Sequence, residues 1–281
     1  MRQITTTQIT KSTAELFKEA CYQLPDDVIR VLEKSRNEEA SPVARNVLEK
    51  MLQNATVASQ GNVPLCQDTG TAVVFIKLGQ EVHISGGSLY DAITEGVRLG
   101  YKEGYLRKSM VAQPYSSRNN TKDNTPPVIH LDLVPGDKLE VIALPKGGGG
   151  ENMSKLAMLI PASGREGVID FIVNTVSEAG SNSCPPVIVG VGIGGTSEKA
   201  MLLAKEALLR EIGSINCNPE NAELEKEILT RINNLGIGAM GYGGSITALA
   251  VHIKTFPCHI GCMPVAVNLQ CHSARHKRAV I

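Results

Sequence analysis

The run Val187-Ile188-Val189-Gly190-Val191-Gly192-Ile193-Gly194-Gly195 is followed directly by Thr196 and Ser197, and this stretch decides the fold class. Its β-branched residues predict a buried strand. The hydroxyl side chains after the glycines predict the N-cap of a helix over residues 196–212. A strand, a tight turn and a helix in succession are typical of proteins that combine helices with sheets. The sequence therefore predicts a mixed α/β (α+β) fold.

The pattern on either side of this run supports the same class. Apolar residues recur at helical spacing across residues 10–58, and they predict a helical entry. Further helices are expected at residues 89–106, 167–179 and 222–235, and strands at residues 72–78 and on both sides of Cys262. Residues 128–133 and 139–144 alternate polar and apolar side chains around Pro135-Gly136-Asp137, which predicts an antiparallel hairpin. We expect one domain over residues 1–281, with a possible helical subdomain at residues 1–60.

Composition excludes several classes of function. The 281 residues include 28 basic and 28 acidic side chains, so the formal net charge of zero argues against nucleic acid as a partner. The apolar stretch at residues 235–253 is interrupted by glycines and polar residues, so no membrane partner is expected. The first residues lack the apolar core of a signal peptide, and seven unclustered cysteines fit a reducing compartment. We therefore expect a cytoplasmic protein.

Three cysteines lie in runs rich in Gly, Pro, Asn or Gln rather than in apolar periodic segments: Cys66, Cys184 and Cys271. Loop thiols of this kind suit an iron–sulfur cluster held by three protein ligands, which leaves one iron open as a Lewis acid. The alternative for any single cysteine is a buried inert thiol. Cys21, in a helical pattern, and Cys217 keep that second interpretation.

Two glycine-rich segments suggest binding of an anion. Residues 190–195 match the letters of the dinucleotide fingerprint, but no second strand with an acidic residue follows. We therefore interpret this run as a tight turn between a strand and a helix, and an NAD-binding dehydrogenase is a distant alternative. Residues 146–152 carry four consecutive glycines after a strand, and their amides could receive a carboxylate. No Gly-Lys-Ser/Thr follows them, so they are not a P-loop.

Other residues allow a functional and a structural interpretation. Asp68 stands two residues after Cys66, where a proton-transfer group would be useful, but it could also cap a turn. Arg107 could clamp a substrate carboxylate, although an arginine that ends a helix is also favoured by the helix dipole. A structural zinc site is a further possibility, formed from Cys258, Cys262, Cys271, His259, His272 and His276.

Four motifs in one order closely resemble the alpha-type subunits of the class I iron–sulfur fumarase and L(+)-tartrate dehydratase family. They are Leu65-Cys66-Gln67-Asp68-Thr69-Gly70, Lys146-Gly147-Gly148-Gly149, Val191-Gly192-Ile193-Gly194-Gly195 and Asn268-Leu269-Gln270-Cys271-His272. The resemblance covers nearly the whole chain. It implies a [4Fe-4S] cluster on Cys66, Cys184 and Cys271, with Cys258 and Cys262 as bystanders.

The resemblance also implies the roles of the remaining site residues. Gln67, Asp68, Arg107 and Gly148 would contact a small dicarboxylate substrate, and His259 would share proton transfer with Asp68. A beta-type subunit would complete the active site. The implied reaction is reversible hydration of fumarate to (S)-malate, with dehydration of L(+)-tartrate to oxaloacetate as the alternative. A cluster-carrying subunit without catalysis of its own remains a third possibility.

Overall fold

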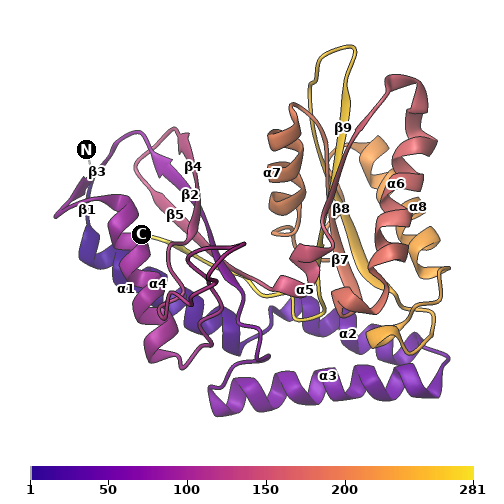
Figure 1. The fold of residues 1–281 in the computed structure, drawn as a ribbon, viewed down its shortest axis with the longest axis horizontal. Coiled ribbons are helices and arrows are strands. Elements are labelled where there is room, and N and C mark those ends of the chain that lie inside the picture. The colour runs from indigo at the N-terminus through magenta and orange to yellow at the C-terminus, as the bar shows by residue number, and fades with distance from the viewer. Residues whose placement is uncertain (1) are drawn as a thin grey trace. The chain divides into compact units, whose positions relative to one another are not determined.

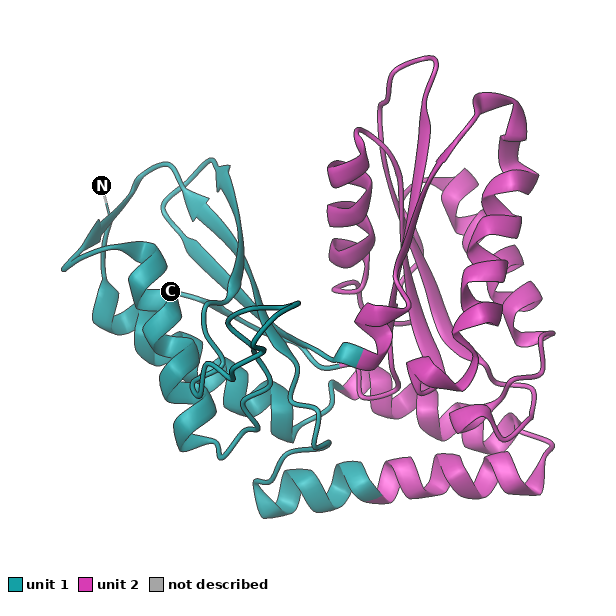
Figure 2. Cartoon of the chain, viewed as in Figure 1, with its two compact units in different colours: residues 1–25, 54–148, 275–281 teal, residues 26–53, 149–274 magenta. Residues whose placement is uncertain are grey.

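The computed structural model describes residues 2–281 and divides into two compact units (Figure 2). Unit 1 comprises Met1–Pro25, Asn54–Gly148 and Arg275–Ile281. Unit 2 comprises Asp26–Gln53 and Gly149–Ala274. Each unit has its own hydrophobic core. The mixed α/β class expected from the sequence is confirmed.

Unit 1 is a four-stranded sheet with the order β10-β5-β2-β4 and two long helices (Figure 1). The helices α1 and α4 pack against each other and bury Phe17, Val97 and Tyr101 together with Val74 and Ile76 of the sheet. A capping box between Thr5 and Gln8 begins α1. The elements are β1 (Arg2–Thr5), α1 (Thr6–Tyr22), β2 (Thr71–Gly79), β3 (Val82–Ser85), α4 (Leu89–Glu103), β4 (Val128–Val134), β5 (Leu139–Lys146) and β10 (Lys277–Val280). The short strands β1 and β3 form a separate parallel pair.

The expected hairpin at residues 128–144 is wrong. Strands β4 and β5 do not pair with each other, because β2 lies between them, parallel to β4 and antiparallel to β5. The run of buried residues in β2 suits a central strand, whereas β4 is largely exposed and lies at the edge of the sheet. Alternation in β4 therefore indicates an edge strand and not a hairpin arm.

Unit 2 is a three-layer structure around a sheet with the order β6-β9-β7-β8 (Figure 1). Helix α7 covers one face of this sheet, and α6 and α8 cover the other. The elements are α2 (Asp26–Glu38), α3 (Pro42–Gly61, ending in unit 1), α5 (Gly148–Asn152, beginning in unit 1), β6 (Lys155–Leu159), η1 (Pro161–Ser163), α6 (Gly164–Ala179), η2 (Gly180–Ser183), β7 (Val187–Gly194), α7 (Ser197–Ala207), α8 (Pro219–Asn233), η3 (Ala239–Gly241), β8 (Ala248–Phe256) and β9 (Met263–Gln270).

The helices expected over residues 10–58 are present, but they do not form a subdomain of their own. Helix α1 buries Ile9, Leu16 and Phe17 in the core of unit 1. Helix α2 belongs to unit 2, where it contacts β8. The helical entry is therefore divided between the two cores.

The glycines of residues 190–195 allow close packing of helix α7 on strand β7. A Cβ atom at Gly190 would lie 2.1 Å from the Ala204 carbonyl oxygen, and one at Gly192 would lie 2.0 Å from that of Ala200. These two glycines are therefore required inside the strand by the neighbouring helix and do not form a phosphate-binding loop. At the N-terminus of α7 the carboxylate of Glu198 accepts a hydrogen bond from the Thr196 hydroxyl. The geometry gives no support to the dinucleotide interpretation.

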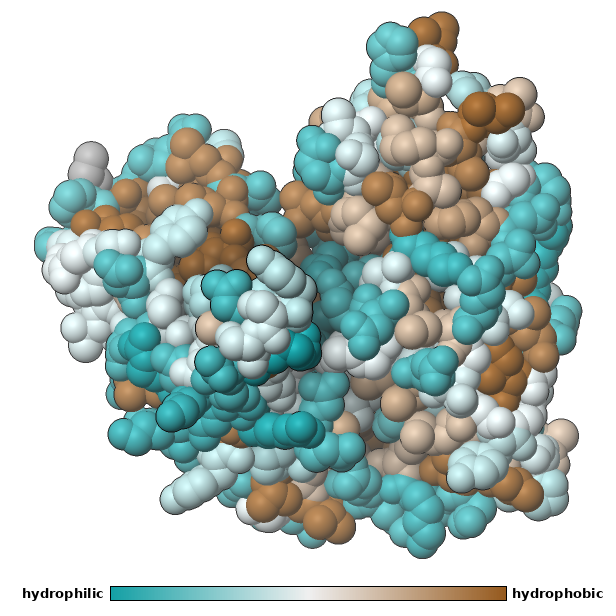
Figure 3. All heavy atoms as spheres, in the orientation of Figure 1, coloured by the Kyte–Doolittle hydropathy of each residue, from teal (hydrophilic) through white to brown (hydrophobic). Residues whose placement is uncertain are grey.

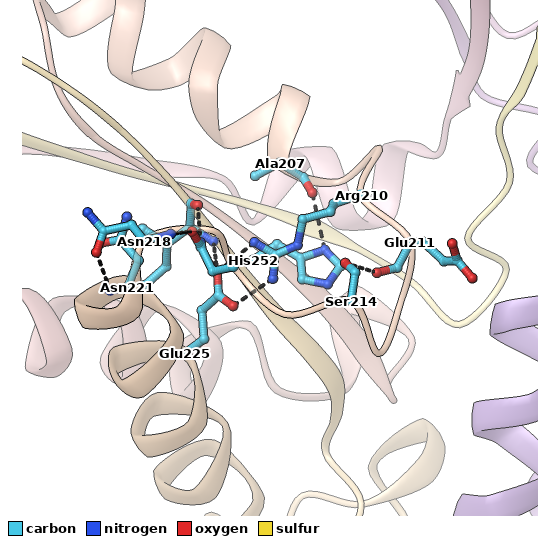
Figure 4. A network of polar contacts seen from close by, with 10 residues as sticks. Ala207, Arg210, Glu211, Ser214, Asn218, Asn221, Glu225 and His252 are labelled. Carbon is cyan, nitrogen blue, oxygen red and sulfur yellow. Dashed lines mark hydrogen bonds and ion pairs between the residues drawn. The ribbon is translucent and has the colours of Figure 1, made fainter.

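A buried polar network covers the edge strand β8 of unit 2 (Figure 4). The Glu225 carboxylate accepts two hydrogen bonds from Arg210, at 2.7 and 2.6 Å, and one from the Ile253 amide at 2.7 Å. His252 is 2% exposed, and its Nδ1 lies 3.2 Å from the Ala207 carbonyl oxygen. The network satisfies main-chain groups that an edge strand would otherwise leave exposed.

We expect the stability of the protein to fall on mild acidification because of His252. Burial, together with the nearby charge of Arg210, lowers the pKa of His252 from 6.5 to about 4. The unfolded chain takes up this proton below about pH 6.5 and the folded chain does not, so stability is lost as the pH falls from about 6.5 to about 4. The loss should reach about 3 kcal/mol at pH 4. Urea unfolding at pH 7 and pH 4.5 measures it.

The control for this expectation is His252→Gln, which keeps a hydrogen-bond donor for Ala207 but cannot titrate. It should flatten the dependence on pH over this window. Glu225 does not confound the comparison in the upper part of the window. Burial alone would raise its pKa, but hydrogen bonds from Arg210, Asn216 and Ile253 lower it, so its contribution is lost only at more acidic pH. A wild-type protein equally stable at pH 7 and pH 4.5 would contradict the assignment.

Candidate active site

The Cys66 loop of unit 1 is held through its main chain. The Leu65 amide donates to the Cys21 carbonyl oxygen at 2.9 Å, and the Leu65 carbonyl accepts from Asn54 at 2.8 Å. The buried Tyr101 hydroxyl lies 2.6 Å from the Thr69 carbonyl oxygen and 3.0 Å from that of Gly70, so its one proton is shared between them. These contacts fix the loop while the Cys66 side chain stays partly exposed. The loop is therefore preorganised to present a thiol.

Asp68 links this loop to the glycine-rich segment of unit 1. Its Oδ1 accepts a hydrogen bond from the Gly70 amide at 3.0 Å, and its Oδ2 accepts one from the Gly148 amide at 2.7 Å. The Asp68 amide in turn donates to the Cys66 sulfur at 3.4 Å. Three residues expected at the site, Cys66, Asp68 and Gly148, are thus brought together. The turn-capping role of Asp68, which the sequence left open, is present in the structure.

Gln67 and Arg107 adjoin the same loop with exposed side chains. The Gln67 amide oxygen is the acceptor in a 3.7 Å contact from the Cys66 thiol. The main chain of Arg107 is held by the Thr69 hydroxyl, which donates to its carbonyl oxygen at 2.6 Å. Arg107 is therefore anchored at its base, and the exposed side chains of both residues are available to a ligand.

Two buried cations beside the Cys66 loop were not expected from the sequence. Lys146, at the end of β5, is 1% exposed. Its main chain lies close to Gly70, since a Cβ atom added to Gly70 would be 2.7 Å from the backbone nitrogen of Lys146. Arg275 is 2% exposed, and its guanidinium donates to the Asp68 carbonyl oxygen. The sequence signal was weak, because Lys146 begins the glycine run and Arg275 is one basic residue in a basic C-terminal segment. Buried positive charge suits a site for anions.

Cys184 and Cys271 lie at the same end of the sheet in unit 2. Cys184 precedes β7 and Cys271 follows β9, and these antiparallel strands pair Ile188 with Gln270. His272 ties the two loops together, since its Nδ1 lies 3.1 Å from the Cys184 carbonyl oxygen. Cys184 has a left-handed backbone with φ of 53°. Non-glycine residues adopt this conformation infrequently, but six others in residues 2–281 share it, so φ alone assigns no role to Cys184.

A buried carboxylate supports the glycine-rich loop beside Cys184. Glu39 is 1% exposed and accepts hydrogen bonds from the amides of Ser245, at 2.9 Å, and Ile246, at 3.2 Å. The same loop donates from the Met240 amide to the Pro185 carbonyl oxygen at 2.8 Å. Glu39 therefore acts on the Cys184 segment through the loop. Nothing in the sequence around Glu39 pointed to this role.

His259 lies at the other end of that sheet. It belongs to the loop between β8 and β9, and β9 separates it from Cys271 (Figure 1). Its Nδ1 accepts a hydrogen bond from the Gly261 amide at 3.1 Å. Phe256 and Ile260, on the same hairpin, are 51% and 92% exposed, and hydrophobic atoms are visible at this tip (Figure 3). The hairpin thus presents His259 to the outside between apolar side chains.

The zinc interpretation has no support from the geometry. Cys258 and Cys262 lie in the hairpin loop, whereas Cys271 and His272 lie beyond the opposite end of β9. Across residues 2–281 no three His, Cys, Asp or Glu side chains are grouped as a metal site. The three cysteines expected to bind a cluster belong to both units, Cys66 to unit 1 and Cys184 and Cys271 to unit 2.

The other cysteines differ in their surroundings. Burial raises the pKa of the Cys21 thiol to about 11, so Cys21 is an inert core residue as expected. Cys217 is exposed, contrary to the expectation of a buried thiol. No disulfide joins any of the seven cysteines, all of which lie in the described part of the chain.

The fold and these loops define an α/β enzyme with partly exposed loop thiols, buried cations and a carboxylate beside a glycine-rich turn. Comparison with known proteins agrees with this class. The model of the family described as fumarate hydratase (Fumerase) matches residues 10–280. The chain belongs to this family and is a hydro-lyase.

Relatives with curated names are similar over nearly their whole length. The putative L(+)-tartrate dehydratase subunit alpha of Methanocaldococcus jannaschii is 44% identical over 95% of this chain and 95% of its own. The L(+)-tartrate dehydratase subunit alpha of Escherichia coli UTI89 is 33% identical over 98% of this chain and 90% of its own. The family is iron–sulfur dependent. In the described residues 2–281 no helix is long and apolar enough to cross a membrane.

The donor set fits an iron–sulfur cluster. Cys66, Cys184 and Cys271 are each partly exposed, as Cys262 also is, whereas Cys21 is buried. The amide hydrogen bond to the Cys66 sulfur is of the type that stabilises cluster thiolates. Buried Lys146 and Arg275 would offset the negative charge of the group.

Proposed function

We propose that this chain is the alpha subunit of an iron–sulfur hydro-lyase that adds or removes water at a four-carbon dicarboxylate. Cys66, Cys184 and Cys271 hold a [4Fe-4S] cluster, which when bound supplies a Lewis-acidic iron for the substrate's oxygen atoms. The observation that carries the proposal is the juxtaposition of Cys66, Asp68 and Gly148, joined by the 2.7 Å hydrogen bond between Asp68 and the Gly148 amide.

The chain's own residues bind the substrate and move protons. Arg107 and Gln67 present charged and polar groups for a carboxylate, and the amides near Gly148 add neutral donors. Asp68, anchored through both oxygens, is placed to hold or release a proton at its carboxylate. His259 contributes a second proton-transfer group. It lies in the loop between β8 and β9, at the opposite end of β9 from Cys271 of the same chain, so it would act at a site other than the one that this Cys271 helps to form.

The substrate is the finer part of the proposal. Both alternatives lose or gain water next to a carboxylate, and they differ by one hydroxyl group. The names of the relatives favour L(+)-tartrate, converted to oxaloacetate, over the hydration of fumarate to (S)-malate that the sequence motifs first suggested. Anaerobic assays of the complex with L(+)-tartrate, fumarate and malate distinguish the two. Turnover of none of these, with the cluster present, would favour a cluster-carrying subunit without catalysis.

We expect the isolated chain to be nearly inactive and a beta-type partner to restore turnover. The relatives are named alpha subunits, and the groups that complete the active site would come from a beta-type chain. A permanent complex of this kind buries at least ~2,000 Å² of surface. Activity of the chain with and without the coexpressed partner, on matched iron content, measures the effect. Full turnover by the single chain would refute the requirement.

A further inference from the structure

Arg275 stands out among the residues around the Cys66 loop. Its side chain is 2% exposed, so a guanidinium has been removed from water at considerable cost. It donates to the carbonyl oxygen of Asp68. Tyr101, Asn54 and Asn124 also donate to carbonyl groups of this loop, and all three are neutral. A buried charge used on a main-chain carbonyl calls for an explanation beyond ordinary packing.

The surroundings of Arg275 contain the groups proposed for catalysis. The charges of Arg275, Asp68 and Cys66 all act on the Cys21 thiol, so these groups lie close together in unit 1. Arg275 precedes strand β10, which pairs with β5, and β5 ends at the buried Lys146. Along the chain Arg275 lies four residues after Cys271. Within unit 1 it therefore connects the segment that enters strand β10 to the Cys66 loop.

We propose that Arg275 is a positioning residue for the Cys66–Asp68 loop and fixes this loop for cluster binding. The inference rests on the proposed function, which supplies the cluster, and on the hydrogen bond from the Arg275 guanidinium to the Asp68 carbonyl oxygen. The guanidinium holds the Asp68 carbonyl, and this sets the peptide that follows the Cys66 ligand. Hydrogen bonds to a charged donor are stronger than those between neutral groups, so the loop is held more firmly than Tyr101 alone could hold it. Without Arg275 the loop should open locally while the sheet and helices of unit 1 persist.

The test uses the coexpressed complex with Arg275→Met, Arg275→Lys and, as control, Arg278→Met. Arg278 is an exposed residue of β10 and pairs with Ile142 of the same β5 strand. Amide exchange in the apo protein, followed by mass spectrometry over residues 64–72, should be about tenfold faster or more in Arg275→Met. Arg275→Lys should recover part of the protection, because one charged donor remains. Arg278→Met should match the wild type.

Cluster loading gives the second measurement. After anaerobic reconstitution we expect Arg275→Met to retain ~10-fold less iron and sulfide per folded chain, within the range for loss of an outer-shell partner. A merely structural role would lower the yield and thermal midpoint but leave loading per folded chain normal. Normal loading together with unchanged exchange over residues 64–72 would overturn the proposal. If the wild type itself binds no cluster, the proposed function fails, and the exchange result alone decides whether Arg275 positions the loop.

Discussion

Replacing Cys66, Cys184 or Cys271 with serine is expected to abolish cluster binding and turnover together. A serine hydroxyl is a poor substitute for a thiolate at iron, and three ligands leave no spare. The loss should exceed the ~10–100-fold that removal of an outer-shell partner costs. Iron and sulfide analysis, with absorption spectra of anaerobically reconstituted protein, measures it directly. The wild type should contain about one [4Fe-4S] cluster per chain.

Matched controls are available in the same chain. Cys217 is exposed, and Cys258 and Cys262 lie in the hairpin loop at the far end of β9, so their serine variants should keep both cluster and activity. Air and chelators should inactivate the wild type, because an iron without a protein ligand is readily lost. If Cys258→Ser or Cys262→Ser removed the cluster while Cys66→Ser kept it, the ligand assignment would be wrong.

Much of the fold follows from local patterns in the sequence. Helical periodicity predicted α1, α2 and α3, and the apolar run at residues 187–191 predicted β7, because these segments carry their own signal of burial. The pairing of strands carries no such signal. Strand β2 separates β4 from β5 although it comes earlier in the chain, and the turn residues Pro135-Gly136-Asp137 connect strands that are not neighbours in the sheet. Sequence proximity therefore misled the prediction of the hairpin.

The site could be predicted only where the residue type itself carries chemistry. The sequence pointed to the loop cysteines and to the carboxylate after Cys66 because thiols and acids carry chemistry of their own, although Asp68 also caps a turn. Arg275, Lys146 and Glu39 were missed, because their importance lies in burial, and burial of a charged side chain depends on tertiary contacts. Gly190 and Gly192 show the opposite error. Their sequence matches a dinucleotide-binding motif, but the structure requires glycine there because helix α7 packs closely on strand β7.

We expect Asp68→Asn and His259→Asn each to lower turnover by about 10²–10⁴ while the cluster spectrum is retained. Asparagine at position 68 keeps an oxygen for only one of the two amides that bind Asp68, Gly70 or Gly148, and it cannot transfer a proton, so a small fall in the thermal midpoint is expected for this variant. His259 is exposed, so its replacement should cost little stability. Steady-state kinetics of the coexpressed complexes, normalised to iron, measure both effects. Near-normal turnover, or a loss of activity that only follows the loss of iron, would contradict the assigned roles.

The position of His259 makes its prediction sharper. Strand β9 has eight residues and is therefore about 26 Å long at ~3.3 Å per residue. His259 and Cys271 of the same chain lie beyond its opposite ends. A His259 that transfers protons near the iron must therefore serve the site of another copy. Mixing inactive His259→Asn with inactive Cys271→Ser should then restore activity, because some sites would combine an intact cluster with an intact histidine. Random mixing in a twofold dimer gives about one quarter of the wild-type turnover.

Each outcome of the mixing experiment has a definite meaning. Each variant alone, carried through the same dissociation and reassociation, controls for residual activity. Recovery only in the mixture would place His259 in the site of a second copy, presented by the exposed hairpin with Phe256 and Ile260 as its apolar flanks. No recovery, with mixed complexes confirmed by native mass spectrometry, would show that His259 does not act across chains. Since β9 keeps it away from its own Cys271, the activity lost in His259→Asn would then have to be explained by the hairpin's effect on assembly.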